Sequence, residues 1–344
     1  MDPGRALREI AFWLERGREP TYRVRAFRNA AAAADACGDL AQRAESGRLS
    51  EIPGIGKATA KVIEQAYGGQ VPDYLEKVRT AHSDETADSD ETADSDEQGR
   101  ALRAALRGDC HTHSDWSDGG SPVEEMAATA RWLGHEWMVL TDHSPRLTVA
   151  RGLSADRLRQ QLDVVARFNE RSGDFRILTG IEVDVLEDGR LDQDDELLGR
   201  LDFVVASAHS RLRMGSAEMT RRLRAAVAHP RVNVLGHCTG RLLAGRQRPP
   251  STFDADEVFD ACRDSGVAVE INSRPERLDP PRALLRKAFE SDCAFVIDSD
   301  AHAPGQLDWL PYGCARAESC GIPAERIINT RSTDEIVAWA KRRS

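Results

Sequence analysis

The C-terminal part of the sequence alternates short apolar runs with amphipathic stretches, and this alternation constrains the fold more than any other feature. The runs end at Asp109-Cys110 or span 137–141, 176–181, 203–207, 232–236, 267–271 and 294–298. Strands that alternate with helices indicate βα units and a parallel sheet. About seven such units, without a glycine-rich dinucleotide fingerprint after the first, favour an α/β barrel over a doubly wound sheet.

Length and composition place the chain in a broad class. Its 344 residues carry a formal net charge of −10 and allow more than one domain. Since it has neither an apolar run of about 20 residues nor a secretory signal at residues 1–14, we expect a cytoplasmic protein that does not contact a membrane. The seven cysteines form no CxxC pair, which argues against a disulfide scaffold or a cysteine-based zinc finger.

Most of the negative charge lies in one segment. Residues 80–99 contain eight Asp and Glu and no Lys or Arg, and the sequence SDETAD occurs at 83–88 and again at 89–94. Such a segment cannot bury enough apolar surface to fold, so we predict a disordered acidic linker over residues 80–100. It separates an N-terminal domain, 1–79, from a C-terminal domain, 101–344. Because the acidity belongs to the linker, it does not exclude a nucleic-acid partner.

The N-terminal domain reads as helical. Apolar residues recur at helical spacing from Leu7 to Leu14, and a basic stretch, Tyr22–Arg28, precedes an alanine-rich helix. The sequence Pro53-Gly-Ile-Gly56 then leads into an amphipathic helix. A tight turn of this kind presents backbone N–H groups at a helix N-terminus, where a phosphate oxygen can bind.

Histidine, aspartate and glutamate residues follow six of the seven predicted strands. Because the carboxyl ends of barrel strands share one rim, we expect these side chains to meet there. Imidazoles mixed with carboxylates suit Zn, Mn or Fe, and nine donors exceed the four that one tetrahedral ion needs. Close cations of this kind can clamp a phosphate group and activate water. The nine predicted metal ligands are His111, His113, Asp118, His143, Glu182, His209, His237, Asp300 and His302.

Three histidines do not belong to this set. His82 falls in the predicted linker, and His135 and His229 fall at helix ends. We therefore interpret them as structural or solvated.

The motifs HTHSDWSDG, TDH, GIEVD, AHS, GHCTGR and SDAH together resemble the PHP (polymerase and histidinol phosphatase) domain, in the same order, over residues 107–340. The sequences YRVRAFRNAA and IPGIGKATAKVI resemble the helix-hairpin-helix domain that opens bacterial family X DNA polymerases, which also carry a PHP domain. This resemblance implies a small all-α domain joined to a distorted, TIM-like (β/α)7 barrel with three divalent metal ions.

The resemblance also assigns roles. His111, His113, Glu182 and Asp300 would form the catalytic centre and hold one ion; Glu182 would share a second ion with His209 and His237; and Asp118, His143 and His302 would hold a third. Polymerase-linked members of the family act as 3′–5′ exonucleases, typically with manganese. Backbone contacts to DNA, without sequence readout, would come from Gly54, Ile55, Gly56, Lys57 and Lys61.

Other features depart from the polymerase pattern. Only residues 80–100 lie where such polymerases carry their nucleotidyltransferase palm, so we expect no polymerase activity. Val62 stands where lyase-active relatives carry a Schiff-base lysine, and neighbouring Lys61 would face elsewhere on the helix. Asp192-Gln-Asp194 reads as a solvated loop. We expect Cys238, next to His237, to be buried and inert.

Two enzymatic functions remain open at this stage. The first is a DNA phosphodiesterase, a 3′–5′ exonuclease in DNA repair, with a separate repair polymerase as a candidate partner. Arg211, Arg241 and Arg274 follow strand ends and could contact its phosphate, although surface ion pairs explain them equally well. The second is a small-molecule phosphatase of the histidinol-phosphate or nucleotide type. A non-enzymatic scaffold ranks third, because every ligand position is filled.

Overall fold

The computed structural model describes residues 1–82 and 98–342, which form an N-terminal and a C-terminal unit. Residues 83–97, with the repeated acidic sequence, lie outside the described residues. Both ends of the predicted linker differ from the structure: helix α5 (Asp73–His82) continues past residue 79, and the next helix begins at Arg100. His82 is therefore the last residue of a helix and is buried, so its assignment to the linker was wrong.

The N-terminal unit is all-helical, as predicted. Its helices are α1 (Pro3–Arg16), α2 (Thr21–Ala36), α3 (Leu40–Glu45), α4 (Lys57–Tyr67) and α5. Asp2 caps α1 by accepting the Arg5 N–H at 2.7 Å. The leucines and alanines of α1 pack against α2, α4 and α5 in one apolar core. Between α3 and α4 the chain reverses at Gly54, whose φ of +92° suits glycine.

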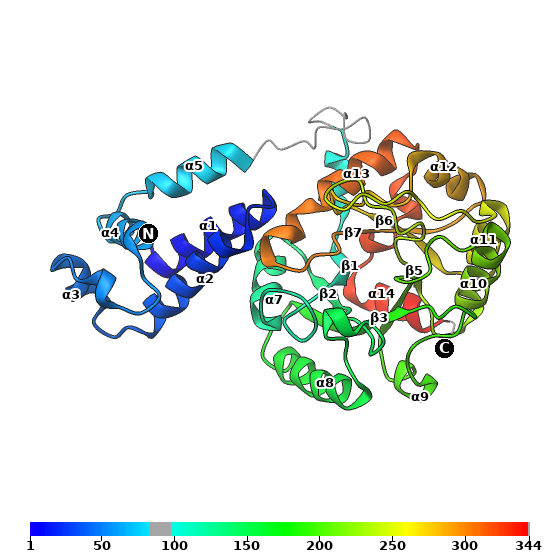
Figure 1. Cartoon of the computed structure of the whole chain (residues 1–344), viewed down its shortest axis with the longest axis horizontal. Helices are drawn as coiled ribbons and strands as arrows, with labels where there is room; N and C mark the ends of the chain where they lie inside the picture. The colour runs from blue at the N-terminus through cyan, green and yellow to red at the C-terminus, as the bar shows by residue number, and fades with distance from the viewer. Residues whose placement is uncertain (83–97, 343–344) are drawn as a thin grey trace. The chain divides into compact units, whose positions relative to one another are not determined.

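The C-terminal unit is a seven-stranded parallel barrel, which confirms the predicted fold class. The strands are hydrogen-bonded in sequence order, and helices surround them (Figure 1). The strands are β1 (Gly108–Thr112), β2 (Trp137–Leu140), β3 (Arg176–Asp184), β4 (Phe203–Ser207), β5 (Val234–Leu235), β6 (Ala268–Asn272) and β7 (Phe295–Asp298). The helices are α6 (Arg100–Ala105), α7 (Val123–Trp132), α8 (Ala155–Asn169), α9 (Asp195–Leu198), α10 (Ser216–Ala228), α11 (Ala255–Ser265), α12 (Arg282–Glu290), α13 (Leu310–Ser319) and α14 (Thr333–Lys341).

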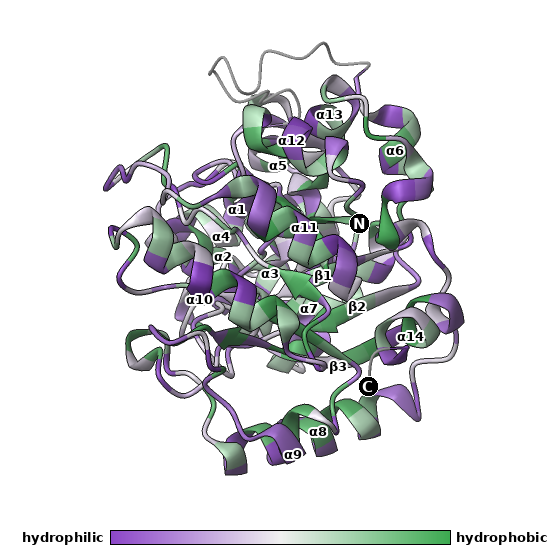
Figure 2. Ribbon diagram, turned by 90° about the vertical axis from the view of Figure 1, so that its right-hand side faces the viewer, coloured by the Kyte–Doolittle hydropathy of each residue, from purple (hydrophilic) through white to green (hydrophobic). Residues whose placement is uncertain are grey.

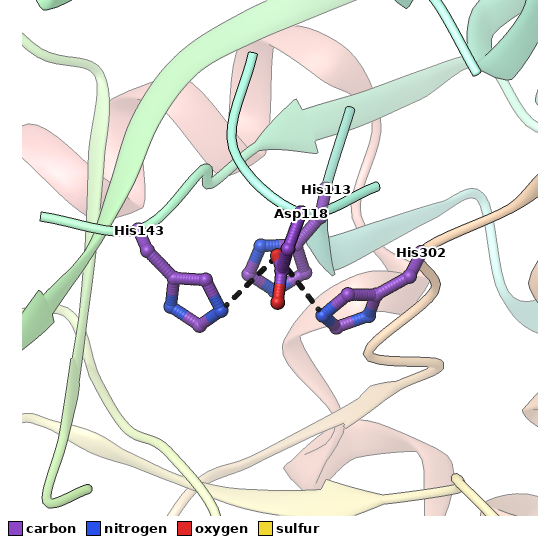
Figure 3. A group of neighbouring side chains, drawn as sticks. All are labelled: His113, Asp118, His143 and His302. Atoms are coloured by element: carbon purple, nitrogen blue, oxygen red, sulfur yellow. Dashed lines mark ion pairs between the residues drawn. The ribbon is translucent and has the colours of Figure 1, made fainter. Parts of the chain in front are cut away.

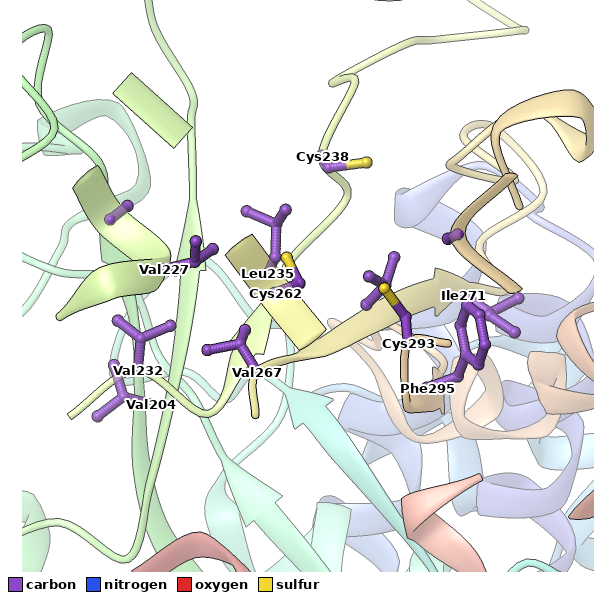
Figure 4. Packing of buried hydrophobic residues seen from close by; sticks show 14 of the residues in the cluster. Val204, Val227, Val232, Leu235, Cys238, Cys262, Val267, Ile271, Cys293 and Phe295 are labelled. Carbon is purple, nitrogen blue, oxygen red and sulfur yellow. The ribbon is translucent and has the colours of Figure 1, made fainter. Parts of the chain in front are cut away.

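Alternation along each strand divides its side chains between two environments. In β6, Val269 and Ile271 pack with the surrounding helices, in the cluster that also holds Cys262 and Cys293 (Figure 4). Ala268 belongs instead to an apolar layer that includes Val205 and Trp339. Figure 2 shows strands β1–β3 as mostly hydrophobic ribbon, whereas helix α8 carries both hydrophobic and hydrophilic residues. Among the described residues no helix is long and apolar enough to cross a bilayer.

Buried polar side chains join β1 to β7. The Cys110 N–H donates to Asp298 at 2.9 Å, and the Ser299 hydroxyl donates to Asp109. The amide of Asn329 receives the Ile297 N–H at 2.8 Å and donates to the Gly108 carbonyl at 3.2 Å. A bridge between Thr112 and Ala301 continues the contact at the carboxyl end. Side chains therefore supply much of the bonding that a regular backbone ladder would supply between these strands.

Candidate metal centre

All nine predicted ligands lie at the carboxyl ends of the strands, where the barrel fold brings them together. They are not equally accessible. His111 and His113 have no exposed surface, and Glu182 is 1% exposed. The side chains of His302 and Asp118 are 17% and 35% exposed. We call the fully buried donors the deep part of the site and the more exposed donors its mouth.

Glu182, on β3, is the centre of the deep part. One carboxylate oxygen, Oε2, lies 3.4 Å from His111 Nε2, 3.7 Å from His113 Nε2 and 2.7 Å from His143 Nδ1. The other oxygen, Oε1, lies 3.2 Å from His209 Nε2 and 2.8 Å from His237 Nε2. The two oxygens therefore face two different sets of imidazoles, which is the arrangement that a carboxylate shared by two ions requires.

Asp118 is the centre of the mouth. Its Oδ1 lies 3.4 Å from His143 Nε2 and 3.4 Å from His302 Nε2, with His113 beside them (Figure 3). Asp300 lies between the two parts, since its Oδ1 is 3.5 Å from His113 Nε2. Asp118, His143 and His302, from the loops after β1, β2 and β7, therefore lie together with His113. That the first three hold one ion stays a prediction.

Three of the imidazoles have an acceptor beside the ring nitrogen Nδ1. The acceptor is a carboxylate that is not itself a predicted ligand in two cases and a backbone carbonyl in the third. His111 Nδ1 lies 2.6 Å from Glu270 Oε1, His209 Nδ1 lies 3.3 Å from Asp184 Oδ1, and His302 Nδ1 lies 2.9 Å from the Asp300 carbonyl. An acceptor at Nδ1 selects the tautomer whose Nε2 lone pair faces the cluster. Neither Glu270 nor Asp184 was among the predicted site residues. Period-two alternation could have found both, because each lies two residues from another inward-facing polar residue.

The donor set fits divalent metal ions. Several buried atoms of the cluster have no hydrogen-bond partner among the described residues: His111 Nε2, His113 Nδ1, His113 Nε2, Glu182 Oε2, His209 Nε2 and His237 Nδ1. Leaving such atoms without partners costs free energy, unless an ion binds them. Neutral imidazoles and carboxylates together suit Zn, Mn or Fe rather than Ca.

The electrostatics of the cluster are strongly coupled. Burial raises the pKa of Glu182, but the charges of His209, His111 and His143 outweigh burial and hold that pKa well below its usual range. Burial lowers the pKa of His143, but Glu182 and Asp118 raise it to about 10. Burial and the charges of His302 and His143 hold the pKa of His113 well below its usual range. In the absence of ions, protons on some imidazoles therefore balance the buried carboxylates.

Asp142 fixes the loop that carries Asp118. Its buried carboxylate accepts the N–H of Ser114 at 2.9 Å, the hydroxyl of Ser114 at 2.6 Å, the N–H of Ser117 at 3.2 Å and the amide of Gln161 at 2.6 Å. Asp142 thus tethers the chain between His113 and Asp118. It precedes His143 directly and was not among the predicted site residues.

The three predicted phosphate-contacting arginines have different environments. The guanidinium of Arg274 lies at the mouth, with Nη1 3.3 Å from His302 Nδ1. Arg211 is 66% exposed and lies 3.5 Å from Glu187. Arg241 is buried and donates to the carbonyls of Arg277 and Leu278. We therefore reinterpret Arg241 as a residue that holds a loop, because its guanidinium is committed to backbone carbonyls.

Arg277 is the cation that sequence reasoning missed. Its Nε lies 3.1 Å from Asp300 Oδ2, and its side chain is 16% exposed. Burial lowers the pKa of Arg277, but Asp300 and Glu182 outweigh burial and raise it above its usual value. Since Arg274 and Arg277 lie on the same loop after β6, this loop supplies the positive charge beside the deep carboxylates.

The hairpin of the N-terminal unit differs in detail from the prediction. The N–H of Ile55 donates to Ile52 at 3.0 Å and the N–H of Gly56 donates to Thr59 Oγ1 at 3.0 Å, while the Ile55 side chain is buried. The first N–H groups of α4, from Lys57 onwards, have no acceptor within the helix and are available to a phosphate. Lys57 is exposed, whereas Lys61 lies 2.8 Å from Asp73.

Two further predictions have clear outcomes. Asp192 is not merely solvated, because it accepts the hydroxyl of Ser144 at 3.1 Å and the N–H of Arg146 and so ties the loop after β2 to the loop after β3. Cys238 is buried, and burial raises its pKa well above the usual value. All seven cysteines are free thiols.

The C-terminal unit is thus a seven-stranded parallel barrel whose mouth holds imidazole and carboxylate donors suited to several metal ions. Residues 109–274 match the sequence profile of the PHP domain, and residues 2–68 match that of a helix-hairpin-helix domain. The chain therefore carries a helix-hairpin-helix domain followed by a PHP domain, as the sequence motifs predicted.

Relatives of two kinds are similar to this chain. The "DNA polymerase/3′-5′ exonuclease PolX" of Bacillus subtilis is 38% identical over 237 residues, which are 69% of this chain and 41% of that protein. A "probable phosphatase" of Caldanaerobacter subterraneus is 27% identical over 248 residues, which are 68% of this chain and 90% of that protein. A solved structure, histidinol phosphate phosphatase of Lactococcus lactis with zinc, L-histidinol and phosphate, covers 63% of this chain and 95% of its own at 18% identity, with a TM-score of 0.45.

Proposed function

We propose that this protein is a metal-dependent exonuclease that removes nucleotides from the 3′ end of DNA during repair. In this proposal the PHP domain hydrolyses the terminal phosphodiester, and the helix-hairpin-helix domain holds the DNA backbone without reading its sequence. No polymerase activity is expected. The site is proposed to bind three divalent ions, with manganese and zinc as the first candidates and iron as a third.

One observation carries the metal-dependent part. The two oxygens of Glu182 face separate sets of imidazoles, three at Oε2 and two at Oε1, within 2.7–3.7 Å. A side chain in this position supports the ligand grouping that the PHP resemblance implies. The proposed ligand roles of the other eight residues rest on their proximity to it or to Asp118.

When bound, the ions would supply Lewis acidity, a water activated near neutral pH and charge for the leaving oxygen. The protein's own side chains would do the rest. Asp118 and His302, the most exposed donors, would meet the phosphate first. Arg274, 3.3 Å from His302, would donate to a non-bridging phosphate oxygen. The depth of Glu182 and His111 would keep bulk water away from the carboxylates.

The DNA substrate is favoured by the N-terminal domain and by the PolX relative, whose printed name includes a 3′-5′ exonuclease. A second candidate, hydrolysis of a small phosphomonoester, is favoured by relatives named as phosphatases that align over nine tenths of their own length. The same donor set would serve either reaction. Only the size and charge of the mouth would distinguish them.

A direct test uses the full chain, reconstituted with Mn²⁺ or Zn²⁺, on 5′-labelled single-stranded and primer-template DNA. We expect stepwise shortening from the 3′ end that EDTA stops and that His113→Ala abolishes. His229→Ala is the matched control, because His229 lies 3.5 Å from Asp195, away from the donor set, and is expected to leave activity unchanged.

Two outcomes would contradict the proposal. Release of phosphate from histidinol phosphate or a nucleotide with DNA left intact would favour the second candidate. Full activity of His113→Ala, or ions bound by other side chains, would overturn the assignment of the site itself.

A further inference from the structure

The loops that follow β4 and β5 carry positive charge that the metal centre does not use. Residues 208–215 and 236–253 contain five arginines and no aspartate or glutamate. The loop after β3, residues 185–194, contains four acidic residues and one arginine. The rim of the barrel is therefore basic on one side and acidic on the other. We use "arginine rim" for the four arginines on the basic side that are not fully buried, Arg211, Arg213, Arg246 and Arg248.

The arginine rim is held by ordered loops. Leu242 and Arg248 form an antiparallel bridge with N–H to O distances of 2.9 and 3.0 Å, so residues 242–248 make a hairpin. Gly245, with φ of +66°, turns this hairpin and places Arg246 at its tip. The Arg248 guanidinium donates to the Gly240 carbonyl at 2.6 Å, which fixes the base of the hairpin.

Contacts between loops make the arginine rim continuous. The Ser251 hydroxyl donates to the Leu212 carbonyl at 2.7 Å and so joins the loop after β5 to the loop after β4. The Leu243 N–H donates to the Glu276 carbonyl at 2.7 Å and joins the hairpin to the loop after β6. That last loop carries Arg274, whose guanidinium lies at the mouth of the donor set.

The charge of the arginine rim is poorly neutralised. Arg213 and Arg246 are exposed and make no ion pair with any residue that the structure describes. Arg211 has one acidic neighbour, Glu187, at 3.5 Å. Burial and the like charge of Arg277 lower the pKa of Arg248, and the charge of Asp279 opposes them only in part. Clustered cations of this kind are stabilised by an anion that spans them.

The loops also begin at residues of the donor set. Arg211 follows His209 by two residues, and the hairpin begins five residues after His237. A chain of phosphates leaving the mouth past Arg274 would therefore meet guanidinium groups on the basic side and carboxylates on the other.

We propose that the arginine rim binds the phosphodiester backbone of the DNA strand whose 3′ end enters the metal centre. This inference rests on the proposed exonuclease function and adds a second DNA-binding surface, on the PHP domain itself. Phosphates two or more nucleotides from the scissile bond would contact Arg213 and Arg246, without readout of base sequence.

The test measures binding of a 12-nucleotide single strand, protected by phosphorothioate linkages, to the full metal-loaded chain between 50 and 300 mM salt. Each phosphate contact to single-stranded DNA contributes about 0.7 to the slope of log affinity against log salt. The double variant Arg213→Ala, Arg246→Ala should therefore lower the magnitude of the slope by about 1.4 and raise KM for DNA. Arg213→Lys, Arg246→Lys should restore most of the slope, because lysine also contacts phosphate.

The matched control is Arg171→Ala, Arg200→Ala, which removes the same charge from exposed residues that precede β3 and β4, at the opposite end of the barrel. It should leave the slope unchanged. The inference is overturned if the arginine-rim variant keeps the wild-type slope, or if the control loses as much. If the wild-type protein shortens DNA but the arginine-rim variant binds DNA with the wild-type affinity and slope, this inference is refuted and the proposed function stands. Wild-type protein that fails to shorten DNA would refute the proposed function.

Discussion

Glu270 Oε1 lies 2.6 Å from His111 Nδ1, at the centre of a barrel where neither side chain has any exposed surface. The other oxygen of Glu270 accepts the backbone N–H of His237. One carboxylate therefore orients two predicted metal ligands, one through its ring and the other through its backbone. Asn272 extends this contact, since its amide nitrogen lies 3.3 Å from Glu270 and 3.2 Å from Asp300.

Replacing Glu270 should weaken metal binding rather than remove a ligand. In Glu270→Gln the amide can accept the His111 N–H or the His237 N–H, but its nitrogen then faces the other donor. Loss of a residue that orients a ligating histidine typically costs 10–100-fold in metal affinity. We expect a decrease of that size in a competition titration of Zn²⁺ or Mn²⁺ against a chromophoric chelator.

Asp202→Asn is the control for this substitution. Asp202 also joins two strands through its carboxylate, accepting the N–H of Thr179 at 3.1 Å and its hydroxyl at 2.9 Å, but it lies at the other end of the barrel. It should alter stability without altering metal affinity. Equal affinities for wild type and Glu270→Gln would show that His111 needs no such orientation.

Substitutions of Gly54 and Gly56 should distinguish a loss of hairpin structure from a loss of direct contact with DNA. Gly54 has φ of +92°, so valine at this position is strained by about 1–3 kcal/mol. Gly54→Val should therefore destabilise the fold of residues 49–67 and also weaken DNA binding. A Cβ on Gly56 meets no atom within 4 Å. Gly56→Val should therefore fold normally and weaken DNA binding only, because its side chain occupies the space that a phosphate needs.

Hydrogen exchange of residues 49–67 and DNA binding at low salt are the two measurements. Gly38→Ala is the control, since its Cβ also meets no atom within 4 Å and it lies outside the hairpin. It should change neither quantity. If Gly56→Val bound DNA like the wild type, the hairpin would be a structural turn.

The contrast between predicted and unpredicted residues has a physical basis. The seven strands and nine donors could be predicted because apolar runs repeat and because His, Asp and Glu at strand ends are conspicuous. Asp142 and Arg277 were missed because their partners are distant in sequence: Asp142 contacts Ser114 and Arg277 contacts Asp300. Glu270 lies on a strand at a position that alternation could have indicated, but its contact with His111 is visible only in the folded chain. Arg241 was misassigned for the same reason, since only the folded chain shows that the carbonyls of residues 277 and 278 accept its hydrogen bonds.

Metal affinity at the mouth should rise with pH. In the ion-free site Glu182 and Asp118 raise the pKa of His143 to about 10, so an ion that binds this imidazole must displace a proton at neutral pH. Each displaced proton increases the apparent affinity about tenfold per pH unit. Mn²⁺ titrations at pH 6.5, 7.5 and 8.5 should show a slope of at least one. His143→Asn should bind more weakly and show a smaller slope, and a wild-type affinity independent of pH would contradict the assignment.

His135 should make the barrel sensitive to acid at the end opposite the donor set. It precedes β2, is 4% exposed and lies 3.4 Å from Arg103. Burial, together with the charge of Arg103, lowers its pKa to about 3. The unfolded chain, with a histidine pKa near 6.5, therefore binds the proton that the folded chain refuses between about pH 6.5 and 3. The contribution of neutral, buried His135 to the free energy of unfolding is therefore present in full above pH 6.5, and it is lost as the pH falls from 6.5 towards 3.

The size of this effect follows from the two pKa values. At pH 5 the free energy of unfolding should be lower by about 2 kcal/mol than at pH 8 through His135 alone. His135→Gln keeps an acceptor for Arg103 and cannot be protonated. In urea denaturation, the decrease in its free energy of unfolding from pH 8 to pH 5 should therefore be smaller than that of the wild type by this amount. All other titrating groups are common to both proteins and cancel in the comparison. Parallel stability curves for the two proteins from pH 8 to pH 5 would mean that His135 accepts a proton in the folded barrel.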